Sequence, residues 1–125
     1  IIFFFFFCKR NSKKIEICYS LVSQQIKKMT LENIEKIQQS EGMFVEIEGI
    51  FRYRFEDVGI YPSKTSSPSE ALWINTAISD SIPNESLQAL DQKKVLVIGK
   101  VNLMNKGHFN GYICSLDSVY CIKEK

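Results

Sequence analysis

Apolar and charged residues alternate along residues 45–55. The apolar residues lie at odd positions and the charged ones at even positions: Val45, Ile47, Phe51, Tyr53 and Phe55 against Glu46, Glu48, Arg52 and Arg54. A period of two predicts a β-strand with one buried face and one solvated face. Gly49 interrupts the apolar row, so we expect a bulge or a sharp bend there.

A hairpin is expected directly after this strand. Residues 58–61 form a second apolar segment, which Pro62 ends. A two-residue turn at 56–57 would place Phe55 opposite Val58, so that apolar side chains face one another along the hairpin.

Three further strands are predicted downstream, each bounded by turn-forming residues. They span residues 71–75, 94–103 and 112–122, the last with a bulge at 116–118. A short helix over 85–91 separates the third strand from the fourth. Five strands with a helix between the third and fourth is the connectivity of an OB-fold. We therefore predict a mainly β, OB-fold-like β-barrel with one or two short helices.

A second short helix is predicted just before the first strand. Thr30 is a suitable N-cap, and Leu31, Ile34 and Ile37 form one apolar stripe at helical spacing. Gly42 is the expected stop.

The first eight residues differ from the rest of the chain. Phe3–Phe7 form an unbroken apolar run that ends at Cys8 and is followed by two basic residues. This pattern is typical of a targeting segment and not of a core. We divide the chain into a signal or lipoprotein-type apolar segment (1–8), a basic linker (9–29) and the barrel domain (30–125).

The overall net charge of +2 hides a division along the chain. Residues 9–29 carry six Lys or Arg against one Glu, which gives +5, and residues 30–125 carry ten against thirteen acidic residues, which gives −3. Nucleic-acid binding is disfavoured, because a nucleic-acid module concentrates its cations on the fold. A basic segment beside an apolar one fits anionic lipid headgroups, although it also serves as a merely solubilising linker.

Cys8 is the candidate lipidation site. The apolar run and the polar residues after it resemble a bacterial lipoprotein signal, which implies a lipid anchor on the periplasmic side of the cell envelope. Phe7 departs from that pattern, which has a small residue at this position. The alternatives are a retained signal-anchor helix, for which seven apolar residues are too few alone, and a misassigned start.

The other three cysteines are Cys18, Cys114 and Cys121. One disulfide with a free thiol and three buried free thiols are both compatible with this number. No Cys-x-x-Cys spacing occurs and the single histidine is His108, so no metal site and no cofactor is predicted.

Aromatic and basic residues on the predicted strands suggest a ligand surface, because OB-folds use such side chains to stack bases or sugars. The same aromatic residues also suit a core. The candidate ligand-binding residues are Arg52, Tyr53, Arg54, Tyr61, Trp73, His108 and Tyr112. His108 lies in a predicted loop, where a turn role competes with a role as general base.

Three motifs carry a resemblance to a known family. They are Phe-Glu-Asp-Val-Gly-Ile-Tyr-Pro-Ser (55–63), Ala-Leu-Trp-Ile (71–74) and Asn-Lys-Gly-His-Phe-Asn-Gly (105–111). Over roughly residues 30–122 the chain resembles uncharacterised small bacterial OB-fold-like proteins that are often predicted to be lipoproteins. The resemblance implies a fold and no mechanism.

Together these patterns predict a non-catalytic, membrane-tethered, extracytoplasmic binding or interaction module. Its expected partners are the membrane, through the N-terminal anchor, and a protein or small ligand. The alternatives are an oligonucleotide- or saccharide-binding OB domain and a small hydrolase that uses His108.

Overall fold

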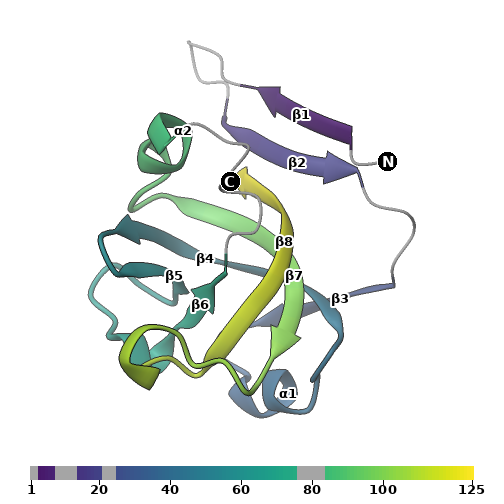
Figure 1. The fold of residues 1–125 in the computed structure, drawn as a ribbon, viewed down its shortest axis with the longest axis vertical. Coiled ribbons are helices and arrows are strands. Elements are labelled where there is room, and N and C mark those ends of the chain that lie inside the picture. Colours follow the sequence, from purple (N-terminus) through teal and green to yellow (C-terminus); the bar gives the residue numbers. More distant parts are fainter. Residues whose placement is uncertain (1–2, 8–13, 21–24, 76–83) are drawn as a thin grey trace.

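Five strands close into a barrel in the computed structural model, which describes residues 3–7, 14–20, 25–75 and 84–125 (Figure 1). The strands are β4 (Phe44–Arg54), β5 (Asp57–Tyr61), β6 (Leu72–Ile74), β7 (Lys94–Asn102) and β8 (Cys114–Glu124). Pairing follows the order β4-β5-β6-β8-β7 and returns to β4, with only β6 and β8 parallel in this ring. Helix α2 (Asn84–Ala89) lies between β6 and β7. The predicted OB-fold-like barrel is confirmed.

The barrel interior is apolar and follows the predicted alternation through most of β4. Val45, Ile47 and Phe51 are fully buried and pack with inward residues of the other strands. Phe55 was expected to continue this row, but its side chain is 90% exposed. The prediction was wrong because β4 ends at Arg54, and Phe55 already belongs to the turn.

The β4–β5 turn lies one residue earlier than expected. Arg54 pairs with Asp57, so the turn residues are Phe55 and Glu56, and Tyr53 pairs with Val58. Glu56 takes up the left-handed conformation that the turn needs (φ 58°). Asp57 belongs to β5 and not to the turn, because it pairs with Arg54, and its carboxylate accepts hydrogen bonds from Tyr61 and Tyr112.

The bulge predicted at residues 116–118 of the last strand lies slightly later along β8, opposite Gly99. Ile98 pairs with Cys121 whereas Lys100 pairs with Asp117, so β8 contains extra residues opposite Gly99. Within this bulge Ser118 has a left-handed backbone (φ 48°). A bulge of this kind bends the long β7–β8 ribbon and helps the sheet to close.

Gly49 lies where β4 changes partner on one edge, from β3 (Ile26–Thr30) to β5. A Cβ atom here would lie 2.7 Å from both Ile60 Cγ1 and the Tyr61 carbonyl oxygen. We expect Gly49→Ala to lower the free energy of unfolding by about 1–3 kcal/mol, because the excess volume meets backbone that cannot move aside. Urea denaturation measures this. Gly111→Ala is the matched control, since its Cβ would meet nothing closer than 3.6 Å, and an equal loss there would contradict the explanation.

The segment predicted as a linker contains two strands. Strand β2 (Glu16–Ser20) pairs with the end of β8, and β3 pairs in parallel with β4. Ile15 and Ile17 are buried, which adds apolar contacts to the barrel that the basic composition of 9–29 concealed. Cys18 and Cys121 are joined by a disulfide.

The first helix begins later than predicted. Thr30 ends β3, and helix α1 spans Ile34–Gln38 with Asn33 as its N-cap. The Asn33 side chain accepts a hydrogen bond from the Lys36 amide at 3.2 Å, which satisfies an amide at the start of the helix.

Residues Phe3–Phe7 form strand β1, which pairs antiparallel with β2 at the upper edge of the view in Figure 1. The candidate lipidation site Cys8 lies outside the described residues. Among the helices that the structure describes, none has the length and apolar character needed to cross a membrane.

Candidate ligand-binding face

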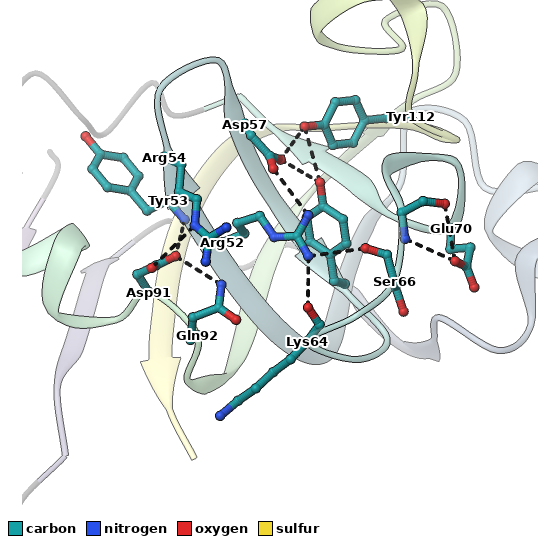
Figure 2. A network of polar contacts seen from close by, with 12 residues as sticks. Arg52, Tyr53, Arg54, Asp57, Lys64, Ser66, Glu70, Asp91, Gln92 and Tyr112 are labelled. Carbon is teal, nitrogen blue, oxygen red and sulfur yellow. Dashed lines mark hydrogen bonds and ion pairs between the residues drawn. The ribbon is translucent and has the colours of Figure 1, made fainter.

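Asp57 is the centre of a polar cluster on the outside of the barrel (Figure 2). Its Oδ1 accepts hydrogen bonds from the hydroxyls of Tyr61 and Tyr112, each at 2.5 Å. Its Oδ2 accepts one from Arg52 Nη1 at 3.2 Å. The Asp57 carboxylate therefore connects β4, β5 and the loop that leads into β8 through hydrogen bonds.

The Arg52 side chain is only 11% exposed and its terminal nitrogens are engaged. Nη2 donates to the carbonyl oxygens of Lys64 and Ser66, both at 3.2 Å, and the guanidinium lies 3.7 Å from the centroid of the Tyr61 ring. Arg52 thus fixes the loop after β5. It is not positioned to bind a phosphate from solution.

The cluster keeps a single protonation state near neutral pH. Burial opposes ionisation of Asp57, but hydrogen bonds from Tyr112, Tyr61 and Arg52 outweigh it and hold the pKa of Asp57 below its usual value. Burial, followed by the bond to Asp57, raises the pKa of Tyr61 to about 12, and the same two causes raise the pKa of Tyr112. Near neutral pH the Asp57 carboxyl is therefore ionised and both tyrosine hydroxyls are protonated.

Tyr53 and Arg54, two other candidates from the sequence, lie at a second polar contact. The Tyr53 amide donates to Asp91 Oδ1 at 2.8 Å, and Arg54 Nε lies 3.8 Å from Asp91 Oδ2. The Tyr53 hydroxyl donates to Asn84 Oδ1 at 2.7 Å, at the start of α2. Figure 2 shows Tyr53, Arg54 and Asp91 on the side of Arg52 away from Tyr112.

Trp73 and Tyr112 anchor the β7–β8 loop against the outer face of β5 and β6. Their ring centroids are 5.2 Å apart, and Gly107 (φ 72°) packs so closely that a Cβ there would lie 2.7–2.8 Å from both side chains. Tyr61 and Tyr112 are buried in this contact and Trp73 is partly buried. The loop thus covers the tyrosines that the sequence suggested as stacking surfaces.

Two aromatic side chains in the β4–β5 turn and the β7–β8 loop are exposed, in contrast to the covered Tyr61 and Tyr112. Phe55 is 90% and Phe109 is 88% exposed. His108 Nε2 lies 3.0 Å from Glu56 Oε2, and this contact brings their two loops together. The His108 nitrogen has no aligned hydrogen bond to a described residue. We call Phe55, Glu56, His108 and Phe109 the rim.

The rim was only partly predictable. His108 was a candidate, but Phe55 was assigned to the core and Phe109 was not considered. The signal for Phe109 was its place in the Gly-His-Phe-Asn-Gly turn of residues 107–111, where a large apolar side chain has no strand to pack on.

A separate groove of about 630 Å³ crosses the outer face of β4. Met29, Leu31 and Ile50 contribute apolar lining, and charged side chains border it. The side-chain nitrogen Nζ of Lys28 lies 3.9 Å from Glu46 Oε2, and Nζ of Lys94 lies 3.9 Å from Glu48 Oε1. The mixture of charges identifies no particular ligand.

Cys114 is the free thiol in the described part of the chain, and burial raises its pKa to about 11. We expect iodoacetamide to modify Cys114 only after unfolding, because in the native protein the Cys114 thiol is protonated and the reagent cannot reach it. Peptide mass mapping after alkylation of the native and denatured protein measures this. Rapid modification of Cys114 in the native protein would contradict its placement in the core.

Among the residues that the structure describes, no group of three or more His, Cys, Asp or Glu side chains is placed to hold a metal ion. Comparison of the chain with protein-family models, curated proteins and solved structures gave no match. The resemblance to small bacterial lipoprotein-like proteins therefore stays a prediction, and any functional proposal rests on the residues described above.

Proposed function

We propose that this protein is a non-catalytic binding module, tethered by its N-terminal segment on the extracytoplasmic side of a bacterial membrane. The disulfide between Cys18 and Cys121 is the observation that carries the location. Disulfides persist in oxidising compartments and are rare in the cytosol. This bond also fixes β2, close after the apolar segment and Cys8, to the last strand of the barrel.

The absence of catalysis is supported by how the reactive groups are engaged. Asp57, Tyr61 and Tyr112 satisfy one another, and the Cys114 thiol is buried and protonated. For the hydrolase alternative, Glu56 could orient His108. Cys114 does not meet the requirement for an activated nucleophile within reach of that base.

The location is tested by trapping thiols in bacteria that express the full-length gene from its native start. After acid quenching and alkylation, we expect peptide mapping to recover Cys18 linked to Cys121. A variant that lacks residues 1–8 and everything before them is the control, and should contain both thiols reduced in the cytosol. Reduced, alkylated Cys18 and Cys121 in the product of the native gene would contradict the proposal.

A further inference from the structure

We infer that, once the segment before Cys8 is removed, the edge of β2 that β1 occupies binds an extended apolar segment of a partner protein by strand addition. This inference names a partner for the proposed tethered module and rests on that function, because hydrolysis of the peptide bond between Phe7 and Cys8 removes β1. Three features carry it: the strand that already occupies this edge, the backbone groups that its removal leaves unpaired, and the composition of β2.

Strand β1 shows that this edge accepts an extended apolar strand. Phe3–Phe7 pair antiparallel with Glu16–Ser20 along the whole length of both strands (Figure 1). Among the described strands β1 pairs with β2 alone, at one end of the sheet order. The ring of five barrel strands pairs without it. Removing β1 therefore leaves the barrel pairing intact and opens one edge.

The backbone groups that face this edge follow from the pairing of β2 with β8. The Ile15 carbonyl accepts a hydrogen bond from the Glu124 amide at 2.7 Å, so the backbone of Ile15 faces β8. In an antiparallel pair, successive residues turn their N–H and C=O groups alternately to one side and to the other. The residues of β2 that face β1 are therefore Glu16, Cys18 and Ser20. Without β1 their amides and carbonyls form an unpaired row, which is the template that strand addition uses.

Strand β2 lacks the residues that protect an exposed edge from pairing with another chain. Lysine and proline on an edge strand are the usual protection. Strand β3, at the opposite end of the sheet order, carries Lys27 and Lys28, and both are exposed. Strand β2 contains neither residue type, and its one charged residue, Glu16, pairs with Lys123 at 3.7 Å between Oε1 and Nζ. Of these two edges, β2 is the one suited to a partner strand.

A row of buried residues indicates what the partner strand should carry. Val97, Ile122 and Ile17 pair in line across β7, β8 and β2, and all three are fully buried. The next position in this row is Phe6 of β1. A second copy that paired through β2 would place Tyr19, with its polar hydroxyl, opposite Ile17. The row therefore favours a different protein with an apolar residue at this position.

The test uses the mature protein, purified in detergent from membranes of bacteria that express the native gene, and the capped peptide Lys-Thr-Phe-Thr-Phe-Thr-Lys. Its phenylalanines take the positions opposite Ile17 and Tyr19, as Phe6 and Phe4 do in β1. We expect saturable binding by isothermal titration. We also expect slower amide exchange by NMR at Cys18 and Ser20, which face the peptide, and no change at Ile17, which faces β8.

Two methylated peptides are the matched controls. In this register the threonine amides face β2 and the phenylalanine amides face away. Methylation of the threonine amide nitrogens should weaken binding by about tenfold or more, because it removes the backbone hydrogen bonds that the peptide donates. Methylation of the phenylalanine amide nitrogens should leave the affinity close to that of the parent peptide.

Three results would overturn the inference. They are no saturable binding, equal affinities of the two methylated peptides, and a mature protein that protects the Cys18 and Ser20 amides by self-association without any peptide. Intact mass, measured first, separates these failures from failure of the proposed function. An unprocessed chain would overturn both proposals, whereas a processed chain that does not bind the peptide overturns the strand addition alone. An intact Cys18–Cys121 disulfide and a cooperative melting transition would exclude misfolding as the cause.

Discussion

Replacing Asp57 with alanine is expected to lower the free energy of unfolding by about 3 kcal/mol. The change removes three hydrogen bonds to one carboxylate and leaves the largely buried guanidinium of Arg52 without its counter-ion. Breaking a buried pair from one side costs about 3–5 kcal/mol, and the lower end applies because Asp57 retains 26% side-chain exposure. Chemical denaturation monitored by Trp73 fluorescence measures the loss.

Glu56→Ala is the matched control for Asp57→Ala. It removes a carboxylate from the neighbouring residue, whose side chain is about half exposed and pairs with His108 Nε2. Such a pair contributes at most about 1 kcal/mol. A loss for Asp57→Ala no larger than that for Glu56→Ala would show that Asp57 does not hold the loops together.

The same cluster sets the pH dependence of stability. The folded-state pKa of Asp57 is depressed, so its contribution is present above the unfolded value of 3.8 and is lost as pH falls through the lower folded pKa. The pKa of Tyr61 is raised, so its contribution is present below 10 and is lost as pH rises towards about 12. We expect the stability difference between the parent and Asp57→Asn to be constant from pH 5 to 8 and to shrink below pH 4.

Removing the disulfide is the second large effect that we expect. The bond joins residues 103 positions apart, and disulfides typically stabilise proteins by about 2–4 kcal/mol, more for longer loops. The free energy of unfolding of Cys18→Ser/Cys121→Ser should be lower by about that amount. Backbone amides of β2 should also exchange faster, since among the described barrel strands it is the end of β8 with which β2 pairs. Denaturation and hydrogen exchange measure the two effects.

Reduction provides the control for this prediction. Dithiothreitol should destabilise the parent as much as the double substitution does, and should leave the double variant unchanged. If reductant destabilised both proteins equally, the effect would arise elsewhere and the assignment of Cys18 and Cys121 as partners would be wrong.

The barrel was predictable because its strands carry regular periodic signals. The alternation over residues 45–54 and the apolar run over 95–98 match buried faces, and Gly99 coincides with a real distortion. The strands that pair with the outside of the five-stranded barrel were less predictable. Ile15 and Ile17 are two apolar residues in a basic segment, and their burial depends on long-range contacts with β8: Ile17 pairs with Ile122, and the Ile15 carbonyl accepts a hydrogen bond from the Glu124 amide.

The candidate face was less accessible to sequence reasoning than the fold. The same alternation that placed Phe51 correctly in the core also extended to Phe55, because periodicity does not reveal where a strand ends. The turn position depends on Asp57, whose partner Tyr112 lies 55 residues away. Local patterns hold no information about such a contact, so the sequence left open whether the tyrosines are buried or bind a ligand, and the exposure of the phenylalanines escaped prediction.

The tether is tested most directly by intact-mass spectrometry of the mature protein, purified from membranes of bacteria that express the full-length gene from its native start. Our account predicts a chain that begins at Cys8 and carries a diacylglyceryl adduct, with a further two-hydrogen deficit for the Cys18–Cys121 disulfide. An unprocessed chain without the lipid adduct would contradict it.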